Sequence, residues 1–347
     1  MTDNKICIPI FLASDDNYAP LLSIAMYSIL YNTNNFINFY VLDDGIADFH
    51  KRQISKCLQE KFNSFSLEFI PLDVNKEFKD HNITPNYPTL SIYSRFLIPN
   101  IKPNINKAIY LDCDTIVLDD ITKLYNENLD GYPIGAVPEH KFNVEVLKLK
   151  NNAQNSLNHN YFNSGVLLID CEKWRKNNFI NDLLKISLPK LLCPDQDILN
   201  NYFDNNYKVL SFKYNLKSAD IFQNNQCKKL FNRDGVIDDI ENSKNNPVIK
   251  HFNMPDRAWQ TNKGLNAEKI KFFEDFWFFA KMTPFYNGLL NNFNIANINI
   301  KKNKKKIFIK IFNIIPFINI KIKNNNKKIY LFNFLPILTI KDKAENE

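Results

Sequence analysis

Two carboxylates one residue apart, Asp112 and Asp114, lie in an apolar stretch and could bind a metal ion. The stretch 107–118 predicts a buried strand, on which residues two apart point to the same face. Adjacent buried carboxylates repel each other unless a positive charge neutralises them. Oxygen ligands favour Mg²⁺ or Mn²⁺, which usually also bind phosphate oxygens. We therefore expect a metal–diphosphate site at this Asp-x-Asp motif. A polar strand end before a turn is the alternative, which Asp119 and Asp120 illustrate.

His251 and Arg257 could complete such a site. His251 follows a short apolar stretch, and its neutral imidazole could be a third metal ligand. Arg257 lies in the next loop and could bind diphosphate oxygens in a bidentate manner. A structural histidine and a surface arginine are the alternative interpretation. Arg95, in a predicted helix, could pair with a phosphate or a carboxylate, or could lie on the helix surface.

Two further polar groups suggest recognition of a nucleotide and a sugar. Asp15 and Asn17 follow the first predicted strand, where a carboxylate and an amide can recognise a nucleobase, or can cap the following helix. The run Asp195-Gln-Asp197 opens a predicted helix and suits the hydroxyls of a sugar ring. Such polar groups could also lie beside the positive charge that develops when a sugar is transferred. Helix capping by Asp195 alone would leave Gln196 and Asp197 unexplained.

The elements that must position these residues alternate between strands and helices. This alternation predicts an α/β fold with a mostly parallel central sheet flanked by helices, in which ligands bind beyond the carboxyl ends of the strands. Residues 13–18 and 112–114 lie at such ends and are expected to line one crevice. The strands are expected at 6–12, 39–42, 67–72, 107–118, 131–137, 162–170 and 248–252. Helices are expected at 20–31, 48–62, 87–99, 172–192, 194–200 and 266–280, and residues 220–246 are expected to form a loop.

The composition is that of a globular intracellular protein. The chain has 347 residues, of which 45% are hydrophobic and 14% aromatic, and no apolar run reaches the ~20 residues that a membrane-spanning helix needs. The first residues lack the plan of a signal peptide. Six scattered cysteines fit free thiols in a reducing compartment. We therefore expect a cytoplasmic protein.

The C-terminal residues 296–347 differ from the rest of the chain. Ten lysines crowd between Lys301 and Lys328 without an acid, and the pattern of 312–321 recurs at 332–341. We interpret this basic, aromatic repeat module as one that places the protein on the cytoplasmic face of the inner membrane, where lysines meet anionic lipid. A β-rich module that packs on the main domain is the alternative. Binding of nucleic acid is not expected.

These pieces, in this order, resemble glycosyltransferase family 8, and the likeness spans residues 6–262. It is greatest toward the bacterial lipooligosaccharide and lipopolysaccharide galactosyl- and glucosyltransferases. The matching stretches are Ala13-Ser-Asp-Asp-Asn-Tyr18, Tyr93-Ser-Arg95, Tyr110-Leu-Asp-Cys-Asp114, Phe162-Asn-Ser-Gly-Val166, Asp195-Gln-Asp-Ile-Leu199, and His251-Phe252 with Trp259.

The resemblance implies a GT-A fold for nucleotide-diphospho-sugar transferases. Together with the change of composition toward the C-terminus, it predicts a catalytic domain at 1–265, a helical extension at 266–295 and the basic appendage at 296–347. It also implies Mn²⁺, or Mg²⁺, as cofactor and UDP-galactose or UDP-glucose as donor. The implied roles are as follows: metal ligands Asp112, Asp114 and His251; uridine contacts Ala13, Asp15 and Asn17; donor-sugar contacts Arg95, Asn163 and Asp195; and Gln196 on the reacting face of the sugar.

Three positions in the closing loop depart from the family pattern. Met254, Arg257 and Ala258 stand where the family commonly has Gly, Lys and Pro. Arg257 keeps a group that can reach phosphate, whereas a methionine at the glycine position crowds the approach of the backbone. Ser164 replaces a small apolar residue, so we expect it to influence the choice among hexoses.

The expected activity is retaining transfer of a hexose from a UDP-sugar to a lipid-linked saccharide of the surface glycan. Two alternatives remain open. One is a sugar nucleotidyltransferase, which would need a glycine-rich basic loop where the chain has acidic residues 15–16. The other is a protein that binds a nucleotide sugar at the membrane with little or no catalysis.

Overall fold

The computed structural model describes most of the chain in two compact units. The described residues are 6–73, 90–139, 161–186, 193–221, 236–253, 257–260 and 267–292, together with the strands of the C-terminal segment between 301 and 341. The first unit comprises residues 1–253 and 282–284, and the second comprises 254–281 and 285–347. The predicted boundaries at residues 265 and 295 stay a prediction.

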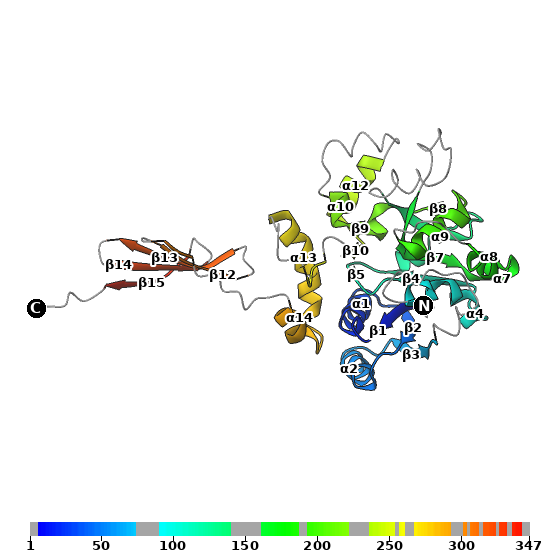
Figure 1. Ribbon diagram of the computed structural model, residues 1–347, viewed down its shortest axis with the longest axis horizontal. Helices are drawn as coiled ribbons and strands as arrows, with labels where there is room; N and C mark the ends of the chain where they lie inside the picture. The colour runs from blue at the N-terminus through cyan, green and yellow to red at the C-terminus, as the bar shows by residue number, and fades with distance from the viewer. Residues whose placement is uncertain are drawn as a thin grey trace, which may run out of the picture. The chain divides into compact units, whose positions relative to one another are not determined.

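A seven-stranded sheet forms the centre of the first unit (Figure 1). The strand order is β3-β2-β1-β4-β7-β6-β8. The pairs along β3, β2, β1 and β4 are parallel, as is β6 with β8, whereas β7 runs antiparallel to both β4 and β6. The prediction of a mostly parallel sheet is therefore confirmed. The strands are β1 (Cys7–Asp15), β2 (Phe36–Asp44), β3 (Phe65–Pro71), β4 (Lys107–Leu111), β6 (Ile134–Pro138), β7 (Phe162–Asp170) and β8 (Lys208–Val209).

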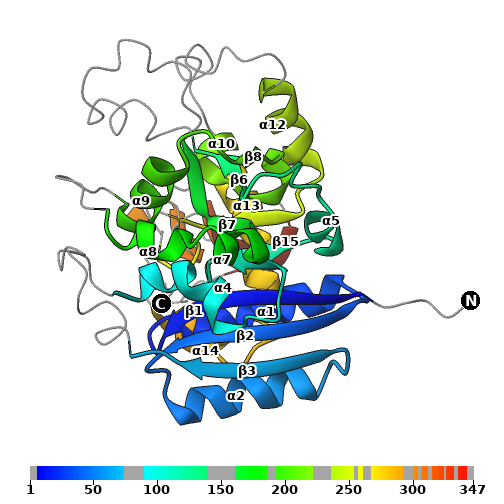
Figure 2. The ribbon, with the colours of Figure 1, turned by 90° about the vertical axis from the view of Figure 1, so that its right-hand side faces the viewer.

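Both faces of this sheet are covered because its central strands are apolar on both sides. In β1, Phe11 joins the core cluster on one face, and its neighbours Ile10 and Leu12 are equally buried. Helix α1 (Ala19–Asn32) packs on β1 and on α2 (Asp48–Gln59). Figure 1 shows α1 on one side of the sheet and α4, α7 and α8 on the other, and Figure 2 shows β1, β2 and β3 side by side.

The helices on the side of the sheet opposite α1 differ from the sequence prediction. Residues 90–101 form a 3₁₀ helix, η1 (Leu90–Leu97), and a short helix, α4 (Ile98–Ile101). The prediction of a single helix over 172–192 is wrong, because the helix ends before Asn178, whose φ of 55° is left-handed. The segment instead forms α7 (Cys171–Lys176) and α8 (Phe179–Leu183), and then α9 (Pro194–Phe203) packs on β7.

A second, three-stranded sheet brings distant parts of the chain to the end of β4. It consists of β5 (Thr115–Val117), β10 (Ile249–His251) and β9 (Leu216–Lys217), with β10 in the middle. The single strand predicted over 107–118 is therefore wrong, because residues 112–114 form a turn between β4 and β5. The two carboxylates lie in this turn and not on a continuous strand.

Residues 220–246 were expected to be a loop, and this prediction is also wrong for the part that the structure describes. Helix α10 (Ser218–Ile221) and helix α12 (Val236–Asn245) occupy its two ends. Helix α12 carries six charged or amide side chains among its ten residues and buries chiefly Ile240 and Ser243, so its sequence has little apolar signal. The described part of the first unit also contains two short elements, α5 (Thr122–Tyr125) and η3 (Phe212–Tyr214).

The described residues of the second unit form two helices and an antiparallel sheet. The helices are α13 (Ala267–Ala280) and α14 (Tyr286–Asn292), and the strands are β11 (Lys301–Asn303), β12 (Lys306–Ile311), β13 (Ile315–Lys323), β14 (Asn326–Leu331) and β15 (Leu335–Lys341). No helix in the described ranges has both the length and the apolar character to cross a membrane.

The internal repeat appears as two hairpins with the same strand pairing. In the first hairpin Lys306 pairs with Lys321, and in the second Asn326 pairs with Lys341. The pairing is irregular after Ile309 in the first hairpin and after Ile329 at the equivalent place in the second. The sequence repeat therefore corresponds to a structural repeat of one β-hairpin.

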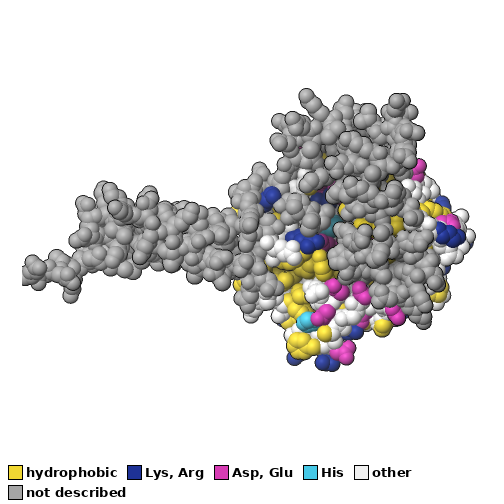
Figure 3. All heavy atoms as spheres, viewed as in Figure 1, with side chains coloured by type: hydrophobic (Ala, Val, Ile, Leu, Met, Phe, Trp, Pro, Cys, Tyr) yellow, Lys and Arg dark blue, Asp and Glu magenta, His cyan; other side chains and the backbone are white. Residues whose placement is uncertain are grey.

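Acidic and basic side chains are mixed on the described surface that Figure 3 shows for the first unit. The net positive charge of the chain comes from the C-terminal segment. Residues 296–347 hold twelve lysines and three acids, whereas the whole chain has a net charge of +7. The remaining residues therefore carry slightly more acids than bases.

Candidate active site

The turn between β4 and β5 is fixed by neighbouring backbone. The Asp112 N–H donates to the Gly165 carbonyl at 2.8 Å, and the Phe252 N–H donates to the Asp114 carbonyl at 2.9 Å. The Thr115 hydroxyl donates to the Asp112 carbonyl at 2.8 Å. The backbone of β7 and of the residue that follows β10 therefore holds the turn in place.

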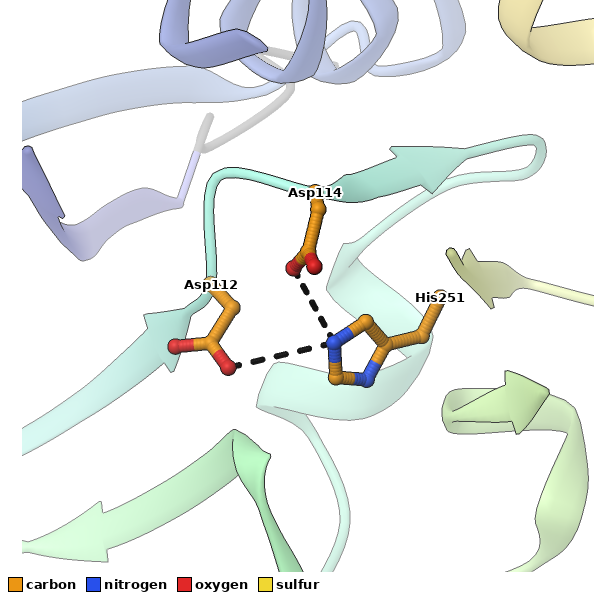
Figure 4. Close-up of side chains that lie close together, drawn as sticks. All are labelled: Asp112, Asp114 and His251. Carbon is orange, nitrogen blue, oxygen red and sulfur yellow. Dashed lines mark ion pairs between the residues drawn. The ribbon is translucent and has the colours of Figure 1, made fainter. Parts of the chain in front are cut away.

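The His251 side chain points at these two carboxylates (Figure 4). His251 pairs with Thr115 across the three-stranded sheet, and this pairing places the imidazole beside the turn. The Nε2 atom lies 3.0 Å from Asp114 Oδ1 and 3.8 Å from Asp112 Oδ2. The three residues offer ligand atoms that all lie within 4.8 Å of one another. The side chains of Asp112 and Asp114 are 27% and 13% exposed, so a ligand can reach them.

The three side chains fit a divalent cation. Two carboxylate oxygens and one imidazole nitrogen are a donor set that suits Mn²⁺. Burial alone lowers the pKa of His251, but the carboxylates of Asp114 and Asp112 outweigh burial and raise it. The imidazole thus lies in a strongly negative environment, which would also attract a metal ion.

Gly165 leaves the space that this arrangement needs. A Cβ atom at this position would lie 2.3 Å from His251 Cε1 and 2.6 Å from Asp112 Oδ2. Real Cβ atoms do not approach other atoms so closely. Any side chain larger than hydrogen would therefore displace the imidazole or the carboxylate.

Arg95 is buried beside the site and binds two carboxylates. Its guanidinium contacts Asp112 Oδ1 and Asp195 Oδ2, each at 3.0 Å. It also donates to the Ser164 carbonyl at 2.7 Å and to the Ile92 carbonyl at 3.0 Å. Burial lowers the pKa of Arg95, but the carboxylates of Asp112 and Asp195 raise it by more than burial lowers it. The pKa is therefore above its ordinary value, and the group stays charged. The interpretation of Arg95 as a helix-surface residue is therefore wrong, because the residue is only 5% exposed.

The contacts of Asp112 leave one of its oxygens directed at the site. Its Oδ1 atom accepts hydrogen bonds from Arg95 at 3.0 Å and from the Tyr110 hydroxyl at 2.8 Å. The Oδ2 atom is the one that faces His251. Arg95 and Tyr110 thus orient the carboxylate for a ligand at Oδ2.

Asp195 does not cap helix α9. The N-cap residue is Cys193, which makes no side-chain cap, and the Cys193 N–H donates to Asp197 Oδ2 at 3.0 Å. Asp195 instead accepts from the Ser164 hydroxyl at 2.8 Å and pairs with Arg95. Burial raises the pKa of Asp195, and Arg95 counteracts this shift. The capping interpretation of Asp195 is wrong, and the residue belongs to the charged cluster around Arg95.

Gln196 and Asn163 contact each other at the same end of the sheet. The Gln196 Oε1 atom accepts from Asn163 Nδ2 at 3.1 Å and from the Ser164 N–H at 2.9 Å. Its amide nitrogen donates to the Tyr161 hydroxyl at 3.2 Å. Asn163 also donates to Glu139 at 3.1 Å. The residues expected to contact the donor sugar thus lie within one connected group.

The carboxyl end of β1 adjoins the Asp-x-Asp turn. Leu12 pairs with Leu111 in the sheet, and the Cys113 thiol donates to the Ala13 carbonyl at 3.1 Å. Asp15 accepts from the Tyr18 N–H at 2.9 Å and from Asn17 at 3.3 Å. The two strand ends thus meet at one edge, as expected. The uridine contacts proposed for Ala13, Asp15 and Asn17 stay a prediction.

Arg257 belongs to the second unit and is described only within that unit. Its guanidinium lies 5.9 Å from the Trp259 ring centroid and donates to Gln260 Oε1 at 3.3 Å. The Trp259 ring in turn contacts the Phe276 ring at a centroid distance of 5.7 Å. The diphosphate contact proposed for Arg257 stays a prediction, and Met254 lies outside the described residues.

Sequence reasoning missed three buried residues around this site. Asn215 accepts from His251 and donates to Asn163, and Gly165 leaves space for the side chains of His251 and Asp112. Lys217 is fully buried, 3.1 Å from Asp220 and 4.0 Å from Glu139. Lys217 stands between Leu216 and Ser218 in a mixed polar and apolar stretch, so the sequence alone carries no signal of its burial.

Comparison with known proteins adds a family and a fold. The model of the glycosyl transferase family 8 matches residues 9–263. General stress protein A of Bacillus subtilis (strain 168) is 30% identical over 258 residues, which cover 72% of this chain and 86% of that protein. Lipopolysaccharide 1,2-glucosyltransferase of Escherichia coli is 30% identical over 209 residues, which cover 58% of this chain and 60% of that protein.

Among solved structures, the galactosyltransferase LgtC in complex with donor and acceptor sugar analogues has a TM-score of 0.62 with this chain at 22% identity. The match covers 82% of this chain and 100% of LgtC. At this identity the match shows a shared fold.

Proposed function

The chain belongs to glycosyltransferase family 8 and has the GT-A fold, and from this we propose that it is a metal-dependent, retaining hexosyltransferase. The donor we propose is UDP-galactose or UDP-glucose, and the acceptor is a saccharide. One observation carries the proposal. Asp112, Asp114 and His251, from distant parts of the chain, bring their ligand atoms within 4.8 Å of one another.

The proposed roles of the residues follow from their contacts. Asp112, Asp114 and His251 would hold Mn²⁺ or Mg²⁺, which would neutralise the diphosphate of the donor and of the leaving UDP. Asp195, fixed by Arg95 and Ser164, would accept hydrogen bonds from sugar hydroxyls. Asn163 and Ser164 lie beside it, so they would contact the same sugar.

We propose transfer by attack on the face that the leaving group occupies. The acceptor oxygen would form the new bond to the anomeric carbon while the bond from that carbon to the UDP oxygen breaks. The acceptor proton would pass to a phosphate oxygen of UDP. Gln196, held by the Ser164 N–H and by Asn163, would stabilise the positive charge on the sugar through its amide dipole. Configuration at the anomeric carbon would be retained.

Release of UDP should require both a hexose donor and a divalent cation. We expect the full chain to release UDP from UDP-galactose or UDP-glucose with Mn²⁺, and to lose at least about 99% of this activity in excess chelator. The measurement is a coupled assay of UDP with both donors, and added Mn²⁺ should restore the rate. Formation of UTP and a sugar 1-phosphate from the UDP-sugar and added pyrophosphate would favour a sugar nucleotidyltransferase. Tight binding of a UDP-sugar without UDP release would favour a non-catalytic binding protein.

We further propose a lipid-linked acceptor, such as lipooligosaccharide or lipopolysaccharide core, at the cytoplasmic face of the inner membrane. One matched relative is named a lipopolysaccharide 1,2-glucosyltransferase, which supports this acceptor class. The excess of lysine in residues 296–347 would attract anionic lipid headgroups. Each lysine near such a surface contributes about 1 kcal/mol.

Deletion of residues 300–347 should remove most membrane association and spare hydrolysis of the UDP-sugar. We expect binding to vesicles that contain anionic lipid to fall at least about tenfold, because the deletion removes twelve lysines. The measurement is co-sedimentation with anionic and with neutral vesicles. A full-length control with the ten lysines between 301 and 328 replaced by glutamine separates charge from apolar contact. Equal membrane binding by the truncated chain would contradict the proposed role of this segment.

A further inference from the structure

Asn215 connects the proposed metal site to the proposed sugar site. Its Oδ1 atom lies 2.9 Å from His251 Nδ1, and its Nδ2 atom donates to Asn163 Oδ1 at 2.8 Å. Asn163 in turn donates to Gln196 Oε1 at 3.1 Å. Asn215 is completely buried. A single side-chain amide thus contacts one proposed metal ligand and one proposed sugar contact.

The orientation of these amides follows from two backbone donors. The Gly165 N–H donates to Asn163 Oδ1 at 3.0 Å, and the Ser164 N–H donates to Gln196 Oε1 at 2.9 Å. A backbone N–H can only donate, so both of these side-chain atoms must be carbonyl oxygens. The atom of Asn215 that faces Asn163 Oδ1 must therefore be its amide nitrogen. The atom of Asn215 that faces His251 must then be its carbonyl oxygen.

This orientation determines where the His251 ring carries its proton. A carbonyl oxygen can only accept, so Nδ1 must donate to it. In a neutral imidazole the proton on Nδ1 leaves a lone pair on Nε2, and Nε2 is the atom that faces Asp114 and Asp112. Without Asn215, the neighbouring carboxylate of Asp114 would favour the opposite tautomer, with the proton on Nε2. That tautomer cannot bind a cation through Nε2.

We propose that Asn215 is a positioning residue that fixes the tautomer and direction of His251 for a divalent cation, and that it couples this ligand to Asn163 in the donor-sugar site. The inference rests on the proposed function, because it assumes that His251 is a metal ligand. Outer hydrogen-bond partners of metal-ligating histidines typically contribute 10–100-fold to metal affinity. Asn215 would therefore influence metal binding without touching metal or substrate.

Two substitutions separate positioning from general support of the fold. Asn215→Leu has a similar size and removes both hydrogen bonds. Asn215→Asp keeps an acceptor for His251 Nδ1–H but loses the donor to Asn163. We expect Asn215→Leu to weaken Mn²⁺ binding by about 10–100-fold. We expect Asn215→Asp to bind Mn²⁺ at least as tightly as wild type and to raise KM for the UDP-sugar at saturating Mn²⁺.

The control is Asn32→Leu. Asn32 also donates two hydrogen bonds, to the Ser28 and Val117 carbonyls, but it contacts none of the proposed site residues. It should lower thermal stability and leave Mn²⁺ affinity unchanged. Mn²⁺ dissociation constants of the full-length proteins are measured from the electron paramagnetic resonance signal of free Mn²⁺, and folding is checked by circular dichroism.

A second measurement reads the tautomer directly. In metal-free protein at a pH where the ring is neutral, ¹⁵N-histidine spectra should show the His251 proton on Nδ1 in wild type and in Asn215→Asp. In Asn215→Leu it should move to Nε2. A wild-type proton on Nε2, or equal loss of Mn²⁺ affinity in both variants, or unchanged affinity in Asn215→Leu, would overturn the inference. Absence of Mn²⁺ binding by wild type would instead overturn the proposed function.

Discussion

An Asp114→Asn variant should transfer sugar at least about 10³-fold more slowly than wild type while keeping its fold, because a metal ion typically supplies several kcal/mol of charge stabilisation. The substitution keeps the size of the side chain and removes one of two negative charges at the site. Asp114 Oδ1 lies 3.0 Å from His251 Nε2, so the amide would replace a charged oxygen at the centre of the proposed ligand set. The rate is measured with saturating UDP-sugar and Mn²⁺.

The control for this variant is Asp119→Asn. Asp119 is also part of an acidic pair in the sequence, but its carboxylate is directed to Lys123 on the surface. Its loss should leave transfer within about twofold of wild type, because surface ion pairs contribute little. Mn²⁺ should raise the melting temperature of wild type and of this control, and not that of Asp114→Asn. Full activity of Asp114→Asn would contradict the metal site.

Gly165→Ala should weaken Mn²⁺ binding by at least about 10²-fold and thereby slow transfer. The added methyl group would come within 2.3 Å of His251 Cε1 and 2.6 Å of Asp112 Oδ2. His251 is only 2% exposed and is held by Asn215, so it cannot move away without breaking other contacts. Overpacking of this kind typically costs about 1–3 kcal/mol of stability. Titration of the apoprotein with Mn²⁺ and thermal melting measure the two effects separately.

Gly288→Ala is the matched control, because a Cβ at this glycine would have no neighbour within 4 Å. It lies in helix α14, where alanine should increase stability by about 0.5–1 kcal/mol. Transfer by this variant should equal that of wild type. If Gly165→Ala bound Mn²⁺ as tightly as Gly288→Ala, the space at Gly165 would have no role in metal binding.

The sequence allowed correct prediction of the central sheet and of the strand ends that carry polar residues. Short apolar runs gave β1, β2 and β4, and the parallel arrangement followed from the helices between the strands. The turn at residues 112–114 could not be predicted in the same way. Apolar residues continue on both sides of it, and only the pairing of β5 with β10 shows that the strand is interrupted.

The hydrogen-bonded amides around His251 could not be inferred from the sequence. Asn215 lies 52 residues from Asn163 and 36 residues from His251 along the chain, so their contacts depend on the tertiary structure. The sequence is also rich in asparagine, which gives any single one little weight. Arg95 was recognised as a candidate, but its burial between Asp112 and Asp195 depends on how η1 packs against the sheet.

The two C-terminal hairpins indicate how the length of this segment can change in evolution. Each strand pairing in the first hairpin recurs in the second, from Lys306 with Lys321 to Asn326 with Lys341. Recombination between the two copies would add or delete a whole hairpin and leave every remaining pair aligned. Homologous proteins should therefore differ in this region by complete hairpins, so that the number of lysines, and with it the proposed attraction to anionic lipid, would change in discrete increments.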